Sequence, residues 1–380
     1  MPARQDQGRT AARKLTAMCT RHRAARRWQS VPFAVAALLA GALALPQPAL
    51  AAAAGPSAAF TSLTLLNGWS TYPGSATPAI ADISGTVYLK GAITTSSSST
   101  NNVAFVLPPG FRPAKYVNVP VDMCGATGGE LNIAPTGVTE VISGGANSNA
   151  TCFTSLDGAS FALSPKSFTA VKLQPGWTEF DNLFRKAAAR VAGGFVHLEG
   201  EIKTAGTKPA AFTLPAKFRP SKNVDVLINL CTGSIGSLHI TPSGAVTVQA
   251  EGTGNFWMAQ CGTSLEGASY ALSPKSFTAL TLQNGWMNAP SGTADAAVCN
   301  ISGIVHFRGA IWTNGTNADP FTLPAGFRPA KTVYIPVDLC NGNNGRLEIL
   351  PDGVVVVEAE NGDFTQAQCL TSLDGASFAR

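Results

Sequence analysis

The sequence predicts an all-β protein made of three tandem β-sandwich modules, which we expect to be jelly-roll-like. Residues 60–163, 168–272 and 277–380 repeat one pattern at a spacing of about 108 residues. Within each copy, apolar residues alternate with polar ones between turns rich in Gly and Pro, which is typical of short strands. A repeat of this length can bury a core of its own, unlike the shorter units of solenoid proteins.

The first 51 residues have the pattern of an export signal. Residues 1–30 are basic, residues 31–45 form an apolar run, and the small residues that end at Ala51 suit a cleavage site. The run is short for a transmembrane span, so we expect a secreted, extracellular protein without membrane insertion. An uncleaved anchor is the alternative, and the export route, Sec or twin-arginine, stays open. The modules would then cover residues 52–163, 164–272 and 273–380.

The charge balance changes when this signal is set aside. The whole chain has 27 Lys and Arg against 22 Asp and Glu, but eight of the basic residues and one acid lie in the signal. The 19 basic and 21 acidic residues that remain form no basic stripe for nucleic acid and no polybasic patch for anionic lipid. Charged residues make up only 13% of the chain, which suits an exported β-protein with neutral polar loops.

The clearest strand recurs at residues 117–123, 224–230 and 333–339, where apolar residues occupy every second position. This alternation indicates a strand with one buried face. Pro120 and Pro336 fall on the outward face, and proline has no N–H for a ladder, so we expect an edge strand or a bulge here.

A hairpin follows in each repeat and is clearest at residues 346–358. Pro351 and Gly353 fit the turn, because proline fixes φ at one position and glycine allows a positive φ at another. We expect seven to nine short strands per repeat and no helix of ten residues. The one helix-like stretch, residues 181–190, looks like an insertion peculiar to the second repeat that could form a turn or two of helix.

Six of the seven cysteines beyond the signal fall at matched places, one pair per repeat, and no His or C-x-x-C accompanies them. We therefore expect three disulfides and no metal site. The predicted pairs are Cys124 with Cys152, Cys231 with Cys261, and Cys340 with Cys369. Cys299 aligns with Ala81 and Ala189, which predicts a buried free thiol, with an intermolecular bridge as the alternative.

The repeated motifs resemble the receptor-binding tip (knob) of bacteriophage tail fibres. The motifs are G-x-V-x-[LF]-x-G, F-x-L-P-x-G-[FY]-R-P-A, L-x-I-x-P-x-G-x-V and S-L-D-G-x-S-F. The third repeat matches best, and the second departs at Lys217 and Glu266. The third repeat matches at Val305, Phe307, Gly309, Phe321, Leu323, Pro324, Gly326, Phe327, Arg328, Pro329, Asp374, Gly375 and Phe378.

The resemblance implies small β-sandwiches that assemble as a trimer and grip a cell-surface saccharide or protein. Only four residues, S-P-K-S, join one repeat to the next, so the modules must touch. We therefore expect a monomer with internal pseudo-threefold symmetry. The export signal and the cysteine pairs depart from the family and point to a secreted bacterial protein that has taken up the module.

Several recurring polar and aromatic residues have a structural and a functional interpretation. An Arg and an acid recur in every copy and are expected to hold turns, with a ligand clamp as the alternative. The Trp that opens each repeat is expected to be a packing anchor and alternatively a sugar platform. These residues are Arg112, Arg219, Arg328, Asp157, Glu266, Asp374, Trp69, Trp177 and Trp286.

The histidines give no sign of a catalytic or metal site. His197 and His306 occupy the strand position of Tyr88, and His239 stands alone in a hairpin strand. No acid or nucleophile accompanies them at a strand end, so we expect solvated or edge histidines.

The candidate ligand-binding residues lie where the repeats differ. Trp257 and Trp312 are each unique to their repeat and lie beside an expected loop, where their rings could stack on a sugar or a protein. Thr94, Lys203 and Asn314 belong to the stretches that differ most between copies, and binding specificity usually resides in such stretches.

These observations predict a secreted, non-enzymatic protein that binds carbohydrate or another cell-surface structure. No nucleophile elbow, phosphate loop or dinucleotide fingerprint is present, and no cofactor is implied. One alternative is a structural or adhesive matrix or coat protein without a soluble ligand. A further alternative is a glycosidase whose two acids come from different repeats.

Overall fold

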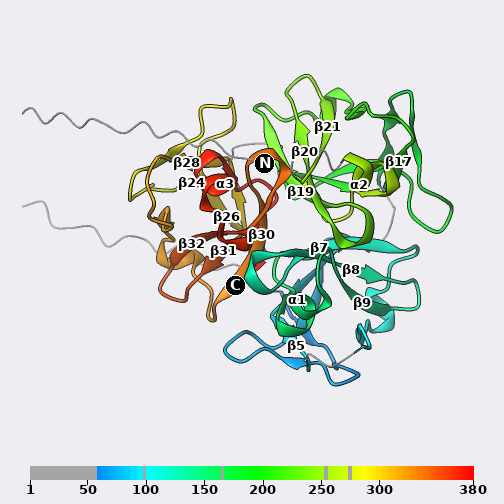
Figure 1. The fold of residues 1–380 in the computed structure, drawn as a ribbon, viewed down its shortest axis with the longest axis horizontal. Coiled ribbons are helices and arrows are strands. Elements are labelled where there is room, and N and C mark those ends of the chain that lie inside the picture. The colour runs from blue at the N-terminus through cyan, green and yellow to red at the C-terminus, as the bar shows by residue number, and fades with distance from the viewer. Residues whose placement is uncertain (1–57, 97–99, 164–166, 252–255, 273–275) are drawn as a thin grey trace, which may run out of the picture. The chain divides into compact units, whose positions relative to one another are not determined.

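Antiparallel strands form nearly all of the regular structure in the computed structural model, which describes residues 58–96, 100–163, 167–251, 256–272 and 276–380 (Figure 1). The expected export signal and most of both linkers lie outside the described residues. The all-β fold class is confirmed. Among the described residues, no helix has the length and apolar character that a bilayer crossing needs.

The elements follow one order in all three repeats, except that the second has one additional short strand, β13. The first repeat has β1 (Thr61–Ser62), β2 (Ser70–Thr71), β3 (Ala79–Ile83), β4 (Thr86–Lys90), β5 (Ala92–Thr94), β6 (Val103–Val106), β7 (Val117–Asp122), β8 (Gly128–Ile133), β9 (Val138–Ser143), α1 (Asn147–Cys152), β10 (Thr154–Ser155) and β11 (Ser160–Ala162). The second has β12 (Thr169–Ala170), β13 (Lys172–Leu173), β14 (Trp177–Glu179), β15 (Ala188–Ala192), β16 (Phe195–Glu199), β17 (Glu201–Thr204), β18 (Ala210–Thr213), β19 (Val224–Asn229), β20 (Ile235–Ile240), β21 (Ala245–Ala250), α2 (Phe256–Cys261), β22 (Thr263–Ser264) and β23 (Ser269–Ala271). The third has β24 (Thr278–Ala279), β25 (Trp286–Asn288), β26 (Ala297–Ile301), β27 (Ile304–Arg308), β28 (Ala310–Thr313), β29 (Phe321–Thr322), β30 (Val333–Asp338), β31 (Asn344–Ile349), β32 (Val354–Ala359), α3 (Phe364–Cys369), β33 (Thr371–Ser372) and β34 (Ser377–Ala379).

Each repeat forms three sheets around a hydrophobic core of its own. In the first repeat the strand orders are β1-β3-β4-β11, β10-β5-β2 and β6-β9-β8-β7, and the other two repeats follow the same plan. Val87, Ile93 and Phe105 come from the three different sheets and are fully buried in one cluster. The second and third repeats have separate clusters of the same kind, so each copy buries enough apolar surface to hold its sheets together.

The strand with alternating apolar residues is β7, β19 or β30 in the three repeats, and it lies at the edge of its sheet. The expectation for Pro120 and Pro336 is thereby confirmed, because each proline sits on a strand that has only one ladder partner.

These three edge strands contact one another pairwise, and Figure 1 shows them together where the repeats meet. The hydroxyl of Ser155 donates to the carbonyl of Tyr334 at 2.6 Å. The hydroxyl of Ser264 donates to Asn118 at 2.8 Å, and that of Ser372 donates to Asp225 at 2.5 Å. Each repeat therefore donates to the edge strand of one neighbour and accepts from the other.

The same junctions explain why the S-L-[DE]-G motif has a glycine at its last position. Gly375 has a φ of 82°, and a Cβ at this position would lie 2.9 Å from Cγ1 of Val226 in another repeat. Gly158 and Gly267 have φ values of 84° and 79° and meet neighbouring repeats in the same way. Only glycine combines this conformation with so close an approach.

The expected number of strands was too low. The described residues hold eleven, twelve and eleven strands in the three repeats, instead of seven to nine. The additional strands span only two or three residues each, such as β1 and β2, and an alternating pattern is not visible over so short a length.

The expected helix at residues 181–190 was wrong, and the segment is not an insertion. Residues 188–190 belong to β15, which corresponds to β3 and β26 in the other repeats. The residues before it bend, because the Asp181 carboxylate accepts from the N–H groups of Leu183 and Phe184. The helices of the described chain instead include α1, α2 and α3, each six residues long, which are too short for a helical period to appear.

Candidate ligand-binding site

The three expected disulfides are confirmed, and each ties a short helix to the turn that follows an edge strand. Their Cα–Cα distances are 5.9, 5.5 and 5.7 Å. The pairs are Cys124–Cys152, Cys231–Cys261 and Cys340–Cys369.

A hollow of about 290 Å³ lies beside the first of these disulfides, between the first and third repeats. We call it the aromatic hollow, and it is lined by Tyr72, Cys124, Gly125, Phe153, Tyr334 and Arg346.

Three aromatic rings in edge-to-face contact form one wall of the aromatic hollow. The ring of Phe153 lies 4.8 Å from that of Tyr72 at 80° and 4.9 Å from that of Tyr334 at 75°. Phe153 is buried, whereas both tyrosines are half-buried. This geometry is the favourable one for aromatic pairs, so the wall holds its shape without a ligand.

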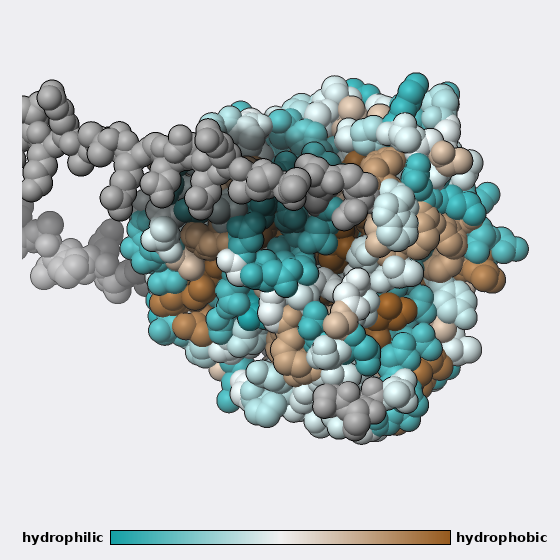
Figure 2. Space-filling model, viewed as in Figure 1, coloured by the Kyte–Doolittle hydropathy of each residue, from teal (hydrophilic) through white to brown (hydrophobic). Residues whose placement is uncertain are grey.

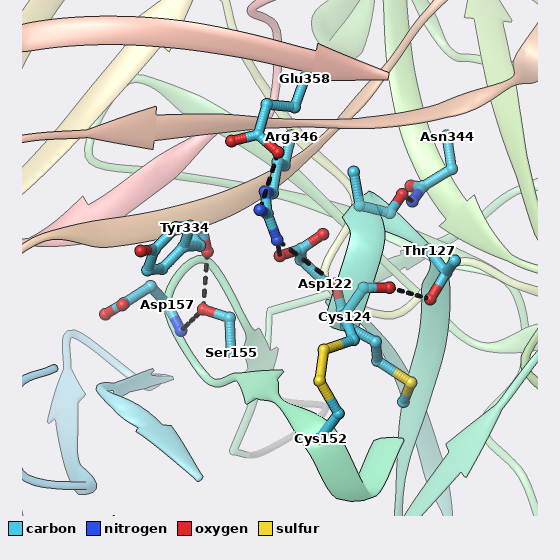
Figure 3. Close-up of polar contacts among 12 residues, drawn as sticks. Asp122, Cys124, Thr127, Cys152, Ser155, Asp157, Tyr334, Asn344, Arg346 and Glu358 are labelled. Carbon is cyan, nitrogen blue, oxygen red and sulfur yellow. Dashed lines mark hydrogen bonds and ion pairs between the residues drawn. A yellow bond between two sulfur atoms is a disulfide. The ribbon is translucent and has the colours of Figure 1, made fainter. Parts of the chain in front are cut away.

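Arg346 closes the other side of the aromatic hollow. Its guanidinium lies 4.9 Å from the ring centre of Tyr334, and its Nη2 donates to Glu358 at 2.8 Å. Its Nη1 donates to the Asp122 carboxylate of the first repeat at 3.2 Å. Figure 3 shows Arg346 between these two acids, with Tyr334 beside Ser155. One cation and two acids therefore leave little net positive charge at the hollow.

Burial sets the charge of Asp122. Loss of solvent raises the pKa of this carboxyl from 3.8 to about 7, and Arg346 opposes the rise only in part. One oxygen of Asp122, Oδ1, has no hydrogen-bond partner in the described structure. The group is therefore partly protonated near neutral pH, which brings the net charge of Arg346 and its two acids from negative toward zero.

The aromatic residues that line the hollow are not repeated at the other two junctions of the described chain. The residues at the position of Tyr334 are Asn118 and Asp225, and those at the position of Phe153 are Gly262 and Leu370. The hollow is therefore a product of substitutions on a repeated scaffold.

The sequence-predicted residues Thr94, Lys203 and Trp312 share one strand position. Each lies on the middle strand of its three-stranded sheet, and in that sheet they pair with Ser70, Thr178 and Met287. The sequence had placed them in or beside the stretches that differ most between the repeats, and in the structure they belong to the strands β5, β17 and β28. Figure 1 shows these three strands in separate repeats, so the structure does not bring the three side chains together.

The surroundings of these three residues differ. The Thr94 hydroxyl donates to the carbonyl of Thr151, and the Lys203 ammonium lies 5.0 Å from the ring centre of Phe180. Trp312 is half-buried, and the exposed Asn314 follows its strand. A small hydroxyl, a cation and an indole at one position make three chemically different outer surfaces.

Trp257 is the second residue of helix α2, and the loop expected beside it falls on residues 252–255, outside the described residues. Its side chain is 55% exposed, the highest value among the large apolar residues of the described chain. Helix α2 packs against β17, the strand that carries Lys203, so these two candidates share a repeat. On the face that Figure 2 shows, apolar residues form several small patches among polar ones.

The recurring Arg and acidic residues hold turns, as expected. The Nε–H of Arg112, Arg219 and Arg328 donates to a backbone carbonyl five residues earlier at 2.8–2.9 Å. The acids accept instead from the N–H of a glycine about 65 residues away in the chain. These pairs are Asp157 with Gly91, Glu266 with Gly200 and Asp374 with Gly309.

The recurring Trp residues are packing anchors, as expected. Trp69, Trp177 and Trp286 are only 6, 5 and 3% exposed. Each indole N–H donates to a backbone carbonyl about 31 residues later in the chain.

The expectation of solvated or edge histidines was wrong. His306 is buried, and His239 lies 2.6 Å from the Asp225 carboxylate on the neighbouring strand. Period-2 alternation assigned these residues to outward faces, but the outward face of one repeat is covered by the next repeat at the junctions.

Cys299 is a buried free thiol, as expected. The alignment of Cys299 with Ala189 was wrong. His306 and His197 occupy the same strand position, and their partners on the neighbouring strand are Cys299 and Arg190. Arg190, and not Ala189, is therefore the counterpart of Cys299 in the second repeat.

The sequence analysis did not identify Tyr72, Phe153, Tyr334 and Arg346. A comparison of the aligned repeats position by position would have marked Phe153, Tyr334 and Arg346, because the counterparts of Phe153 and Tyr334 are not aromatic and those of Arg346 are Glu130 and Ser237. Tyr72 is less distinctive, because Phe180 has its place in the second repeat. The comparison could not show that these residues lie close together, because Tyr72 and Phe153 belong to the first repeat and Tyr334 belongs to the third.

Comparisons with known proteins give no independent support for a family. No family model, no curated protein and no solved structure matches the chain. Within the described residues, no three His, Cys, Asp or Glu side chains cluster as metal ligands would.

Proposed function

We propose that this chain is a secreted, non-catalytic protein that binds carbohydrate on a cell surface through the aromatic hollow. The observation that carries the proposal is the wall of Tyr72, Phe153 and Tyr334, which lines a hollow at one of three equivalent junctions. The repeated residues hold turns, cores and junctions, whereas the residues that break the repeat gather around an open hollow with two accessible tyrosines.

The chemistry of the aromatic hollow suits a neutral sugar. Tyrosine rings offer apolar faces to the C–H groups of a pyranose, and hydroxyl and guanidinium groups offer hydrogen bonds to its oxygens. Arg346 is already paired with two acids, which disfavours a strongly anionic ligand. Much of the hollow is open to solvent, and its cavity volume of about 90 Å³ is well below the roughly 300 Å³ of ordinary ligand pockets, so one terminal sugar residue is the largest unit that it would accept, and only in part.

We further propose that the chain is a pseudo-trimer of tail-fibre-tip-like sandwiches folded from one polypeptide. The cyclic contacts from Ser155, Ser264 and Ser372 support this arrangement, because each repeat uses the same donor on the same edge strand of its neighbour. Joining the three copies in one chain allows each junction to change independently, which a homotrimer cannot do.

The test is a glycan array and a cell-wall polysaccharide pull-down with the full secreted chain. The informative variants carry residues that the other repeats already have at the same positions. Tyr334→Asn introduces the residue of position 118, and Tyr72→Ala introduces the residue of position 289. We expect each variant to fold and to lose at least about tenfold in affinity, which corresponds to one good stacking contact.

Trp257→Ala is the matched control, because it removes an exposed ring far from the aromatic hollow. Loss of binding in this variant, with binding retained in Tyr334→Asn, would move the site to the outer surface of the second repeat. If no surface polymer binds and the chain self-assembles at modest concentration, the structural or adhesive alternative is favoured. Carboxyl-dependent cleavage of a bound glycan would favour the glycosidase alternative instead.

A further inference from the structure

A second hollow, of about 390 Å³, lies where the hairpins β3–β4, β15–β16 and β26–β27 of the three repeats meet. Its lining includes Tyr88, His197 and His306, which occupy one equivalent strand position in the three repeats. We call it the hairpin cup. Neither the aromatic hollow nor any sequence-predicted binding residue belongs to it.

Two polar side chains that line the hairpin cup are buried without hydrogen-bond partners. Tyr88 is 9% exposed and His306 is 6% exposed. Among the described residues, neither the Tyr88 hydroxyl nor the ring nitrogens of His306 contact a donor or acceptor. Neither residue is among those of the described chain with a side-chain polar atom that is both fully buried and unpartnered, so these atoms face the space of the cup. A group inside the cup can therefore serve as their hydrogen-bond partner.

The nearest charge to these groups is positive. Arg190 donates from Nη2 to the carbonyl of Gly85 at 3.0 Å and to the Thr86 hydroxyl at 2.6 Å, which holds its guanidinium beside the cup. Burial and then this guanidinium lower the pKa of His197 to about 4. Burial raises the pKa of Tyr88 to about 12, and Arg190 acts against that rise.

The acids near the cup shift the pKa of Arg190. They are not among the causes of the pKa shifts of Tyr88 and His306. Glu199 and Asp82 raise the pKa of Arg190, whereas burial lowers it. Burial and the neighbouring His197 lower the pKa of His306, with no carboxylate among the causes. Arg190 is therefore the charge that acts on Tyr88 and His197, and it favours an anionic oxygen in the cup, where Tyr88 and the neutral ring of His306 can each donate one hydrogen bond.

The remaining walls of the hairpin cup combine apolar side chains with the hydroxyls of Ser84, Thr86 and Ser302. The ring of Phe195 lies 4.3 Å from that of His306 at an angle of 33°, and both Ile83 and Ile304 line the same hollow. An apolar cavity with a few converging donors is the usual form of a small-molecule site, and such sites occur preferentially between domains.

We propose that the hairpin cup binds a small monocarboxylate with a compact apolar body. The carboxylate accepts hydrogen bonds from the Tyr88 hydroxyl and from a ring N–H of His306. Its apolar body packs against Phe195, Ile83 and Ile304. The ligand would thus contact all three repeats and stabilise their junction, independently of any glycan at the aromatic hollow.

Benzoate is a suitable probe, and benzyl alcohol is its uncharged counterpart. The full chain is titrated with each compound in the presence of EDTA, which prevents metal binding by the histidines. Binding is followed by calorimetry and by the NMR signals of the histidine rings. We expect saturable binding of benzoate, at least about tenfold weaker binding of benzyl alcohol, and shifts in the signals of His197 and His306 but not of His239.

Tyr88→Phe and His306→Gln are the test variants, and His239→Gln is the matched control. Tyr88→Phe removes a hydroxyl that has no protein partner, so we expect an unchanged melting temperature and at least about tenfold weaker benzoate binding. The control should bind as the original chain does. Absence of saturable binding, equal binding of the two compounds, or unchanged affinity in Tyr88→Phe would each overturn the proposal.

Discussion

Arg346 and Asp122 form an ion pair between the third and first repeats, with 3.2 Å from Nη1 to Oδ2 and 224 residues between them in the chain. The equivalent contact at a second junction is neutral, since the Asn229 amide donates to the carbonyl of Gly129 at 3.0 Å. At the third junction Ser237 takes the place of Arg346 and faces the buried carboxyl of Asp338; burial raises the pKa of this carboxyl, and Ser237 opposes the rise. The three junctions thus share a geometry and differ in chemistry. Each edge strand has one matching neighbour, which disfavours a different order of the repeats.

Arg346→Met should destabilise the protein strongly, because it leaves Asp122 buried without its counterion. Removal of one partner of a buried pair typically costs about 3–5 kcal/mol, and we expect a loss near the lower end since Asp122 can take up a proton. Urea unfolding at pH 8 measures this loss.

The double variant Arg346→Met with Asp122→Asn is the matched control for this prediction. Asn already stands at the equivalent position 229, so the amide should fit, and we expect most of the lost stability to return. Glu358→Gln should cost about 1 kcal/mol or less, since Glu358 is 35% exposed. Equal losses in the double and the single variant would contradict the buried-charge explanation.

The protein should be more stable at pH 5 than at pH 8. Burial raises the pKa of Asp157 to about 7 and that of Asp374 to about 8. Burial, together with the charge of Glu201, raises the pKa of Glu130 to about 8. A carboxyl whose pKa is higher in the folded state favours folding below its unfolded pKa. It loses that contribution as the pH rises from about 4 to about 8.

Burial lowers the pKa of His306 to about 3 and that of His197 to about 4, so these residues act in the opposite sense. They favour folding above pH 6.5 and lose that contribution as the pH falls through the folded pKa. We therefore expect the melting temperature to peak between pH 5 and 6 and to fall by at least about 5 °C at pH 8. Glu130→Gln should reduce this fall in melting temperature. A melting temperature that stays constant from pH 5 to 8 would contradict the prediction.

Much of the fold was accessible from the sequence because the repeat samples each element three times. The edge strands, the hairpin turn at Pro351 and Gly353, the disulfides and the packing role of Trp286 all follow from patterns that local chemistry enforces. The short helices that carry Cys152, Cys261 and Cys369 were not predicted, since six residues hold too little periodicity.

The candidate sites were less accessible, for a different physical reason. Tyr72, Phe153 and Tyr334 form one wall although Tyr334 lies in another repeat, and no local pattern encodes the contact of two repeats. His306 was assigned to solvent because its strand alternates, yet a neighbouring repeat covers it. The stretches around Thr94, Lys203 and Trp312 were correctly grouped as variable. Their common strand position became visible only through the pairing of β5, β17 and β28.

Removal of one disulfide should weaken the protein by about 3–4 kcal/mol, the value for a loop of about 30 residues. The variant is Cys231→Ala with Cys261→Ala, and the measurement is guanidinium unfolding without reductant. Cys299→Ala is the matched control, because this thiol is unpaired and the equivalent residue of the first repeat is Ala81. It should change the stability by about 1 kcal/mol or less. A loss of several kcal/mol in the control would indicate an unrecognised role for the Cys299 thiol.

Trp177→Ala and Trp257→Ala should differ sharply although both remove an indole from the second repeat. Trp177 is 5% exposed, packs edge-to-face on Phe256 at 6.3 Å and donates to the carbonyl of Lys208. Its loss leaves a cavity and an unpaired carbonyl, so we expect a cost of about 3–5 kcal/mol. Trp257 is 55% exposed, and its removal should change the free energy of unfolding by less than about 1 kcal/mol. Thermal unfolding followed by circular dichroism separates the two cases. Comparable losses in both variants would mean that Trp257 is buried in solution, by a second copy of the chain or by a partner.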